Sequence, residues 1–341
     1  MKRLLVLAAL SLALLLGVAA FAAVQMDRFL HSPMAITESG AEFVVEPGSS
    51  FRAVSDELED LGYISSSFAF RVWARLTGQA AAIHAGEFHI DPGTTPAEFL
   101  DQLTSGEVIL FSFTIIEGWN YRELLTALQA NEHVKATMTD EDWAGLLEEL
   151  GAADAHPEGL FLPETYRFPR NASDREVLRQ AYELMQETLE EEWAGKAADL
   201  PISTPYEALI LASIIEKETA RVDERQRISG VFTRRLERRM RLQTDPTVIY
   251  GIGPSFNGNL TRKDLRTDTP YNTYTRGGLP PTPIAMPGRA AIHAALHPAA
   301  GDELYFVATG LGDGSHAFSV TKEEHDAAVA EYLQRLRQQR N

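Results

Sequence analysis

Residues 205–221 read PYEALILASIIEKETAR, and their pattern is that of a strong helix. Ser203 or Thr204 is a candidate N-cap, and Pro205 suits the first turn, where a backbone N–H is not needed. At about 100° per residue, the larger apolar side chains gather on one stripe, which is expected to face the core. The stripe consists of Ile210, Leu211, Ile214 and Ile215.

Two glutamates near the end of this helix are expected to differ in environment. Glu218 follows Ile214 by four residues and falls on the apolar stripe, whereas Glu216 projects to the opposite side. Burial disfavours a carboxylate anion and raises its pKa, so Glu218 is a candidate general acid and Glu216 is expected to stay ionised and solvated. Periodicity alone leaves an alternative, in which Glu218 pairs with Arg221 or another arginine.

The chain around this helix is expected to form a larger mixed α+β domain over residues 108–341. A β-rich run at 108–116, a mostly helical stretch to 198 and two strong helices between 205 and 241 are followed by an irregular region to 287, a hairpin of 304–309 with 316–320, and a polar helix at 322–340. Loops this long inside a compact domain are usually functional.

Residues 41–107 are expected to form a small αβ module ahead of that domain. The predicted elements are a strand at 42–46, helices at 50–61 and 67–76, a strand at 86–90 and a helix at 95–103. A compact unit of this kind is a plausible binding module. A structural appendage without a ligand remains the alternative.

The N-terminus predicts export through a membrane. Lys2 and Arg3 precede an uncharged apolar run from Leu4 to Met26. About 20 apolar residues suffice to cross a bilayer as a helix, and the positive-inside rule leaves the N-terminus in the cytoplasm. We therefore expect an anchor over residues 1–28 and a polar stem over 29–40. A signal peptide cleaved near residues 20–22 is the alternative, and it exports the same remainder.

Composition excludes several classes of function. The formal net charge of −17 argues against a nucleic-acid partner, because phosphate binding needs a basic patch. The chain has no cysteine, which rules out a disulfide, a thiolate zinc site and a cysteine nucleophile and suits an oxidising compartment. His293 and His297 have the spacing of helical metal ligands, but the glutamate of a His-Glu-x-x-His motif is missing and Pro298 follows, so no metal site is expected.

Several long blocks resemble the signature motifs of the YceG-like (MltG) endolytic murein transglycosylases. They are LASIIEKET at 211–219, RLQTDPTVIYG at 241–251, YNTY at 271–274, GLPPTPI at 278–284, PEGLFLPETY at 157–166 and EGW at 117–119. The resemblance covers essentially the whole chain. It implies an α+β protein with a transmembrane anchor, a LysM-like glycan-binding module at 41–107 and a catalytic domain at 108–341.

The resemblance also implies an activity and puts the family's catalytic glutamate on Glu218. Lytic transglycosylases use a single glutamate as acid and then base, cut the MurNAc–GlcNAc β-1,4 bond, and leave a 1,6-anhydro-MurNAc end without a metal or organic cofactor. The implied substrate is nascent peptidoglycan close to the bacterial inner membrane, with the catalytic domain in the periplasm and peptidoglycan synthases as partners. A hydrolytic muramidase and a non-enzymatic wall-binding scaffold are the rival functions.

Candidate substrate-binding residues lie mainly in the irregular region. Polar groups precede the rigid Pro246, and tyrosines offer stacking faces of the kind that carbohydrate clefts use. These candidates are Gln243, Thr244, Asp245, Tyr271, Asn272 and Tyr274, together with Glu158. For each the alternative is a role in building the loop itself. Glu158 and Glu164 are the candidates for a second carboxylate.

Overall fold

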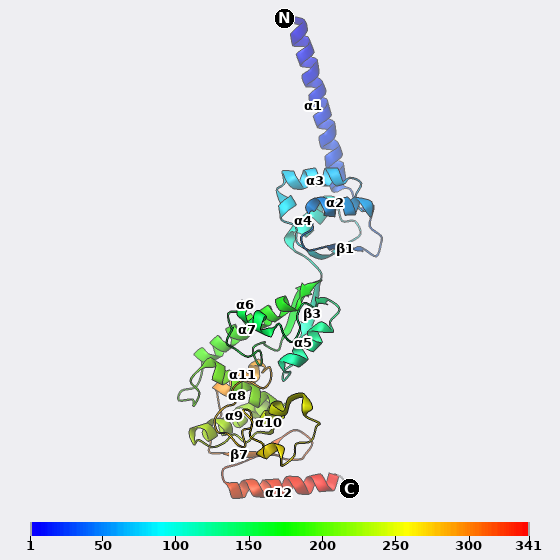
Figure 1. Cartoon of the computed structure of the whole chain (residues 1–341). Coiled ribbons are helices and arrows are strands. Elements are labelled where there is room, and N and C mark those ends of the chain that lie inside the picture. Colours follow the sequence, from blue (N-terminus) through cyan, green and yellow to red (C-terminus); the bar gives the residue numbers. More distant parts are fainter. Residues whose placement is uncertain (1, 340–341) are drawn as a thin grey trace. The chain divides into compact units, whose positions relative to one another are not determined.

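The computed structural model describes residues 2–339, which divide into two compact units (Figure 1). The first unit runs to Phe111 and includes residues 168–171, and the second holds residues 112–167 and those from Ala172 onward. Both units combine helices with two-stranded sheets, so the expected mixed α+β class is confirmed.

The first unit packs three short helices around one antiparallel strand pair. Its elements after the N-terminal helix are β1 (Ala41–Val45), α2 (Phe51–Asp60), α3 (Ser67–Leu76), the 3-10 turn η1 (Gln79–Ala81), β2 (Gly86–Ile90) and α4 (Pro96–Ser105). Phe43 of β1 lies opposite Phe88 of β2, and both rings meet Phe99 of α4 edge-on, at centroid distances of 5.9 and 6.3 Å. This buried aromatic cluster holds α4 against the strands.

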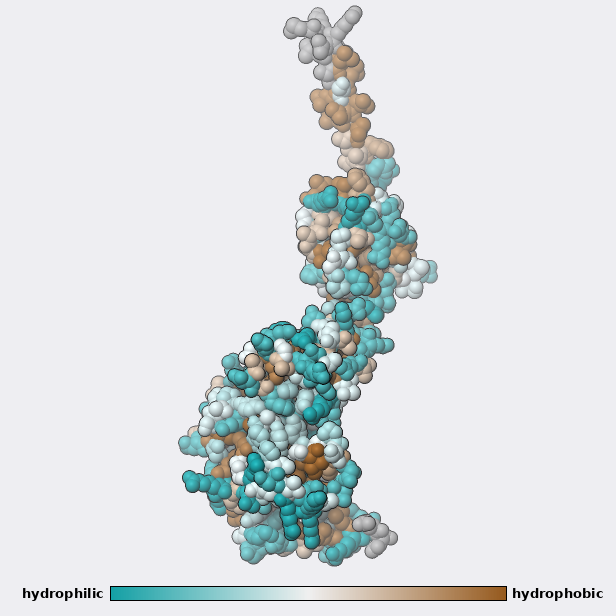
Figure 2. Space-filling model, viewed as in Figure 1, coloured by the Kyte–Doolittle hydropathy of each residue, from teal (hydrophilic) through white to brown (hydrophobic). Residues whose placement is uncertain are grey.

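The N-terminal helix α1 (Lys2–His31) enters this core with its last turn. Its segment Ala9–His31 is long and apolar enough to cross a membrane, and Figure 2 shows the brown surface of this helix. Leu30 is only 3% exposed, and Phe29 packs against the aromatic core. The apolar helix therefore continues directly into the packed part of the first unit.

The segment that follows α1 is bonded to the module. The backbone N–H of Met34 donates to the carbonyl of Thr94 at 2.8 Å, and that of Ala35 donates to the carbonyl of Tyr63 at 3.0 Å. The Met34 side chain is itself buried. These bonds fix the first half of the stretch that the sequence suggests as a polar stem.

The remaining elements belong to the second unit, apart from the strand ends at 110–111 and 168–169, which belong to the first. In chain order they are β3 (Leu110–Thr114), α5 (Tyr121–Gln129), β4 (Val134–Lys135), α6 (Trp143–Glu149), β5 (Thr165–Pro169), β6 (Ala172–Ser173), α7 (Asp174–Ala194), α8 (Pro205–Glu218), α9 (Val222–Glu237), α10 (Asp245–Ile252), η2 (Gly253–Ser255), η3 (Asp264–Arg266), α11 (Arg289–Leu296), β7 (Tyr305–Ala308), β8 (His316–Ser319) and α12 (Lys322–Gln339). Strand β3 pairs with β5, β4 pairs in parallel with β6, and β7 forms an antiparallel pair with β8.

The predicted helix at 205–221 is present as α8, which ends at Glu218. Thr204 is its N-cap and forms a reciprocal capping box with Glu207, while Pro205 occupies the first turn. The chain leaves the helix at Thr219, whose extended backbone ends the helical hydrogen bonding.

The expectation that α8 buries a single stripe is wrong. Every residue from Ala208 to Ile215 is buried, because α7, α9, α10 and α11 all pack against this helix. A helix that is apolar all round belongs in the centre of a fold. The one polar side chain of this stretch, Ser213, is satisfied by donating to the Ile210 carbonyl and accepting from the Ile284 N–H. Ser213 thereby ties the proline-rich loop to α8.

Candidate active site

Glu218 is the last residue of α8 and lines a cavity of about 400 Å³. The Thr244 hydroxyl donates a hydrogen bond to Oε1 of Glu218. Within residues 2–339 Glu218 has no ion-pair partner, and Arg221 pairs instead with Asp223 at 2.7 Å. The alternative of a helix-end carboxylate paired with Arg221 is therefore wrong.

The surroundings of Glu218 favour its protonated form. Burial is the main cause, and it raises the pKa of Glu218 to about 7 although the Thr244 hydrogen bond acts in the opposite direction. The nearby Asp245 carboxylate raises this pKa further, and Arg235 lowers it. A carboxyl group with such a pKa holds a proton in a large fraction of molecules at neutral pH and can also accept one.

Glu216 is not solvated, contrary to the expectation from helical periodicity. Its side chain is 5% exposed and its Oε1 lies 2.7 Å from Nη2 of Arg225, which is 4% exposed. Its other oxygen accepts the backbone N–H of Gly288 at 3.0 Å. Burial raises the pKa of Glu216, while Gly288 and Arg225 oppose the shift. Glu216 and Glu218 thus differ in their partners, since among the described residues only Glu216 forms an ion pair.

A cluster of threonines positions the segment that faces Glu218. The Thr244 N–H donates to Oγ1 of Thr273 at 3.1 Å, and the Thr247 hydroxyl donates to the Thr244 carbonyl at 2.8 Å. Gln243, directly before this segment, has a left-handed backbone with φ of 52° and an exposed side chain. The turn at Gln243 lets Thr244 face inward while the Gln243 amide faces solvent.

The cavity beside Glu218 adjoins a larger cleft. The cavity is lined by Glu117, Gly118, Glu216, Lys217, Glu218, Thr219, Ala220 and Arg225. The cleft has a volume of about 900 Å³ and shares Gly118 and Lys217 with the cavity. The Lys217 ammonium donates to the Gly118 carbonyl at 3.1 Å, so these two residues lie together where the two hollows meet.

The walls of the larger cleft are partly aromatic. Trp119, Tyr250 and Phe256 line it, together with the first turns of α5 and part of α10. Flat apolar rings beside polar groups are suited to the faces and hydroxyls of sugars. The first two lie in the sequence motifs at 117–119 and 241–251, but they are not among the predicted site residues.

Two of the predicted tyrosines lie next to this region without lining either hollow. The Tyr271 ring packs edge-on against Tyr250 at 4.9 Å, and its hydroxyl is 2.9 Å from that of Thr282. The Tyr274 hydroxyl donates to Oδ1 of the exposed Asp245 at 2.6 Å. Tyr271 and Tyr274 therefore orient residues at the site.

Asn272 builds the loop, which is the alternative that the sequence leaves open. Its side chain is fully buried. The amide nitrogen lies 2.7–3.2 Å from the carbonyls of Asp264, Leu265 and Thr267, and its oxygen accepts the Tyr274 N–H. With its polar atoms engaged in this way, Asn272 has the loop-building role, and its contact with a substrate stays a prediction.

Glu158 lies beneath the cleft instead of facing it. Its side chain is fully buried, and Oε1 accepts the Tyr121 N–H at 3.2 Å. Burial raises the pKa of Glu158 to about 8, with a hydrogen bond to Tyr250 acting in the opposite direction. Glu158 therefore lines neither hollow, and its direct contact with a substrate stays a prediction. The other candidate second carboxylate, Glu164, is exposed on the β5 side.

The histidine pair on α11 acquires a carboxylate neighbour that its local sequence lacks. Glu192 of α7 lies 2.9 Å from Nδ1 of His293, and one ligand atom each of Glu192, His293 and His297 fall within 4.8 Å of one another. The two imidazole rings are stacked, with centroids 4.1 Å apart and planes at 17°. Lone pairs in nearly parallel planes do not converge on one ion, so a shared metal would require one ring to rotate.

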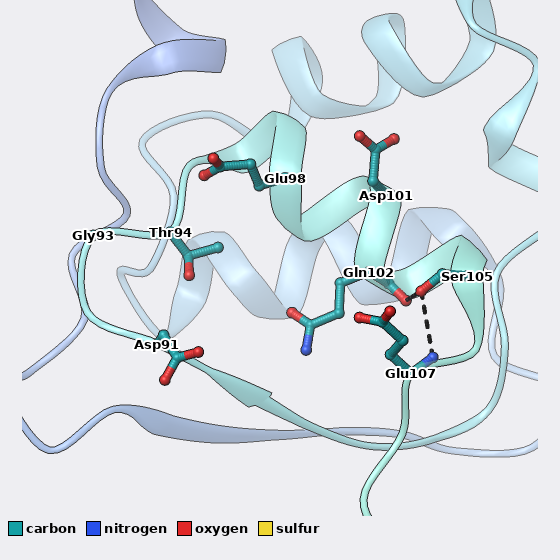
Figure 3. A pocket seen from close by; sticks show the side chains of 8 residues that line it. All are labelled: Asp91, Gly93, Thr94, Glu98, Asp101, Gln102, Ser105 and Glu107. Atoms are coloured by element: carbon teal, nitrogen blue, oxygen red, sulfur yellow. Dashed lines mark hydrogen bonds between the residues drawn. The ribbon is translucent and has the colours of Figure 1, made fainter.

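The first unit has a polar hollow of about 570 Å³ along α4 (Figure 3). It is lined by Asp91, Gly93, Thr94, Glu98, Asp101, Gln102, Ser105 and Glu107. Figure 3 shows that the Asp101 side chain points away from Gln102 and Glu107. Gln102 donates to the His89 carbonyl at 2.9 Å. The hollow offers hydrogen-bonding groups and no aromatic face.

The fold and the site agree with one family of proteins. A sequence profile of the YceG-like family matches residues 43–331, so the chain belongs to the YceG-like family. This confirms the resemblance seen in the sequence motifs.

Characterised relatives carry names that describe an activity. The chain is 31% identical to the endolytic murein transglycosylase of Bacillus subtilis (strain 168), over 85% of this chain and 84% of that protein. It is 27% identical to the endolytic murein transglycosylase of Streptococcus pneumoniae serotype 2 (strain D39), over 89% of this chain and 61% of that longer protein. A crystal structure of a yceG-like protein from Listeria monocytogenes shares 27% identity and a TM-score of 0.54, covering 85% of this chain and 99% of that one.

Proposed function

We propose that this protein is an endolytic lytic transglycosylase of peptidoglycan and that Glu218 is its single acid–base catalyst. The observation that carries the proposal is a carboxyl group with a pKa of about 7 that lines a cavity and forms no ion pair among the residues that the structure describes. The names of the relatives from Bacillus subtilis and Streptococcus pneumoniae support the substrate class.

In the proposed reaction, protonated Glu218 donates its proton to the oxygen of the MurNAc–GlcNAc β-1,4 bond. The bond from MurNAc C1 to that oxygen breaks, and the C6 hydroxyl oxygen of the same MurNAc attacks C1. Glu218, now ionised, takes the C6 hydroxyl proton, so one product ends in 1,6-anhydro-MurNAc and the other in a GlcNAc 4-hydroxyl. No water is consumed, and the acid returns to its starting state.

The hydrogen bonding of Glu218 is compatible with these two proton transfers. Thr244 donates to Oε1, and an oxygen that accepts a hydrogen bond is the poorer place for the acid's own proton. Oε2 has no hydrogen-bond partner within the described part of the chain, so it is the oxygen that exchanges the proton with substrate. Thr244 is a positioning residue in this scheme, and the exposed Gln243 amide contacts sugar hydroxyls or acetamides.

The larger cleft is the proposed glycan track. Trp119, Tyr250 and Phe256 stack on sugar rings there, and Lys217 lies between the cleft and Glu218. The module at 41–107 is proposed as a second, LysM-like glycan contact through the polar hollow of α4. We further propose that α1 is a retained single-pass anchor in the inner membrane, with the catalytic domain at 108–341 in the periplasm near nascent strands and peptidoglycan synthases.

Product masses distinguish the proposed reaction from its rivals. Purified glycan strands are incubated with the wild-type protein, with Glu218→Gln and with Glu237→Gln, a matched change at the exposed end of α9. We expect anhydro-MurNAc ends from the wild type and Glu237→Gln and no cleavage by Glu218→Gln. Reducing MurNAc ends, one water heavier, would identify a muramidase. Intact strands in every sample that nonetheless bind the protein would identify a scaffold.

A further inference from the structure

Helix α3 presents an apolar face that no element of its unit covers. Its buried face carries Phe70 and Ala74. On the other side Phe68 is 69% exposed and Leu76, eight residues later, is 75% exposed, with the half-buried Val72 between them. Residues spaced by four along a helix share one face. The face of Phe68, Val72 and Leu76 is called the α3 stripe below.

A short helix that is apolar on both sides is unusual at a water-facing surface. A buried helix can be apolar all round, as α8 is, and so can a helix in contact with lipid. The first unit provides no cover for the α3 stripe within residues 2–111. The α3 stripe is therefore expected to bind an apolar surface outside the first unit.

The start of α3 lies beside the end of the apolar helix. Helix α1 contacts both α3 and α4. A cavity of about 380 Å³ is lined on one side by Gln25 and Arg28 of α1 and on the other by Gly62 to Ser65, directly before α3. The entry to α3 is thus level with the turn of α1 that ends its apolar run, where a membrane-spanning helix emerges from the bilayer.

Basic side chains accompany the α3 stripe. Arg75 is exposed next to Leu76, and Arg28 is exposed at the end of α1. Neither has an ion pair among the residues that the structure describes. Unpaired arginines close to an apolar face are suited to anionic lipid headgroups. Figure 2 shows brown and teal surface side by side where α1 meets this unit.

We propose that α3 is an interfacial helix that lies on the membrane leaflet from which α1 emerges, with Phe68, Val72 and Leu76 immersed at the level of the headgroups. The partner is the lipid surface itself, because α3 contacts the membrane-spanning helix and begins beside its end. Two contacts then hold the module: α1 passes through the bilayer and α3 lies along it. This inference rests on the proposed anchor and is independent of the proposed catalysis.

The chain is well suited to a depth measurement, since it has no native cysteine. Single variants Phe68→Cys, Leu76→Cys, Leu14→Cys and Glu42→Cys of the full chain carry a nitroxide label in vesicles of phosphatidylcholine and phosphatidylglycerol. Leu14 reports on α1, and Glu42 is an exposed residue of β1. Collision rates with oxygen, which is enriched in lipid, and with a water-soluble nickel chelate give the depth of each label.

We expect an oxygen-to-nickel collision ratio several-fold higher at residues 68 and 76 than at residue 42, and highest at residue 14. Equal ratios at residues 42, 68 and 76, with residue 14 in lipid, would overturn the interfacial helix and leave the anchor standing. A water-exposed label at residue 14 would overturn both. Spin–spin broadening at residue 68 that disappears on dilution with unlabelled protein would identify a second copy as the partner and would also overturn the proposal.

Discussion

Glu218 and Glu216 lie on the same helix, yet only one of them is compensated by a cation. Arg225 forms an ion pair with the Glu216 carboxylate, and the Gly288 N–H donates a hydrogen bond to it, so the negative charge of Glu216 is compensated within the fold. Within the described part of the chain Glu218 accepts one hydroxyl hydrogen bond and forms no ion pair, which leaves its proton free to exchange with a ligand. At the residue scale, catalysis by Glu218 therefore predicts a defined dependence on pH.

The first prediction concerns the alkaline limb of the rate profile. Because the proposed acid must carry a proton, activity is expected to fall about tenfold per pH unit above a pKa of about 7. The measurement is kcat/KM on purified glycan strands between pH 5 and 9. A rate that stays level to pH 9 would contradict the assignment of Glu218 as the acid.

The second prediction concerns Thr244, whose hydroxyl stabilises the ionised form of Glu218. Replacing it in Thr244→Val is expected to raise the pKa of Glu218 and move the alkaline limb upward by about one pH unit, since a hydrogen bond to a charged group contributes about 1.5–3 kcal/mol. Thr188→Val is the control, because Thr188 is also buried and bonds only within α7. An unshifted limb would show that the Thr244 bond is not formed in solution.

The third prediction concerns stability and the buried Glu158. Its pKa is about 8 in the folded protein against 4.5 ordinarily, so between these values the unfolded chain loses a proton that the folded protein keeps. The contribution of Glu158 to stability is thus complete below about pH 4.5 and is lost as pH rises toward 8, by about 1.4 kcal/mol per unit in that window.

Glu158→Gln removes this titration and tests it directly. The variant is expected to be more stable relative to the wild type at pH 8 than at pH 5, measured by thermal unfolding at both values. A difference that does not change with pH would mean that Glu158 is ionised in the folded protein.

At the scale of elements, the glycine turn at 157–159 shows how the site is held together. Gly159 has φ of 80°, and a Cβ there would lie 2.6 Å from Cβ of Pro283. The turn therefore packs against the proline-rich loop, which Ser213 binds to α8 from the other side. Glu158, the middle residue of this turn, is fully buried.

The fourth prediction uses two glycines with similar backbones. Gly159→Ala is expected to cost about 1–3 kcal/mol more than Gly258→Ala, because both strain a left-handed residue but only Gly159 has a close neighbour. Unfolding temperatures of the two variants give the comparison, and glycan cleavage reports on the loop. Equal losses would show that the loop moves to accept the methyl group.

Secondary structure was largely predictable at this scale because its signals are local. Thr204 and Pro205 mark the start of α8, and Ser67–Leu76 has the bounds that the pattern predicts for α3. The pattern does not predict the short helix α10, although its Asp245-Pro246 start is a helix signal, since its surroundings are rich in turn residues.

The environment of the site was less predictable because it depends on contacts between distant segments. Helical periodicity predicts that Glu216 lies on a polar face. It gives no information on Arg225 of α9, which forms an ion pair with Glu216 in the folded protein. In the same way, the residue type of Asn272 suits a sugar contact or a loop, and only the fold brings three carbonyls to its amide. A side chain alone does not specify its neighbours.

At the scale of the whole molecule, the proposed anchor predicts where the chain is located and what can be removed. Deleting residues 2–24 should release the protein from membranes and leave its fold and glycan cleavage intact. A deletion that extends to residue 34 also removes Leu30 and Met34 from the core and should destabilise the first unit. Fractionation after a carbonate wash and thermal unfolding measure the two effects.

Removal of a signal peptide near residues 20–22 is the alternative to a retained anchor, and the mass of the mature protein tests it. The intact mass of protein purified from membranes is expected to include the apolar run, and a mass that begins near Ala23 would contradict a retained anchor. Release of the full chain by carbonate alone would also contradict it.

The last turn of α1 is part of the core of the first unit, and the backbone after it is bonded to that unit. These contacts hold the end of α1 to the first unit. If the helix leans within the bilayer, for example where the membrane becomes thinner, the module must lean by the same angle. A change in the local thickness of the membrane would then change the orientation of the first unit.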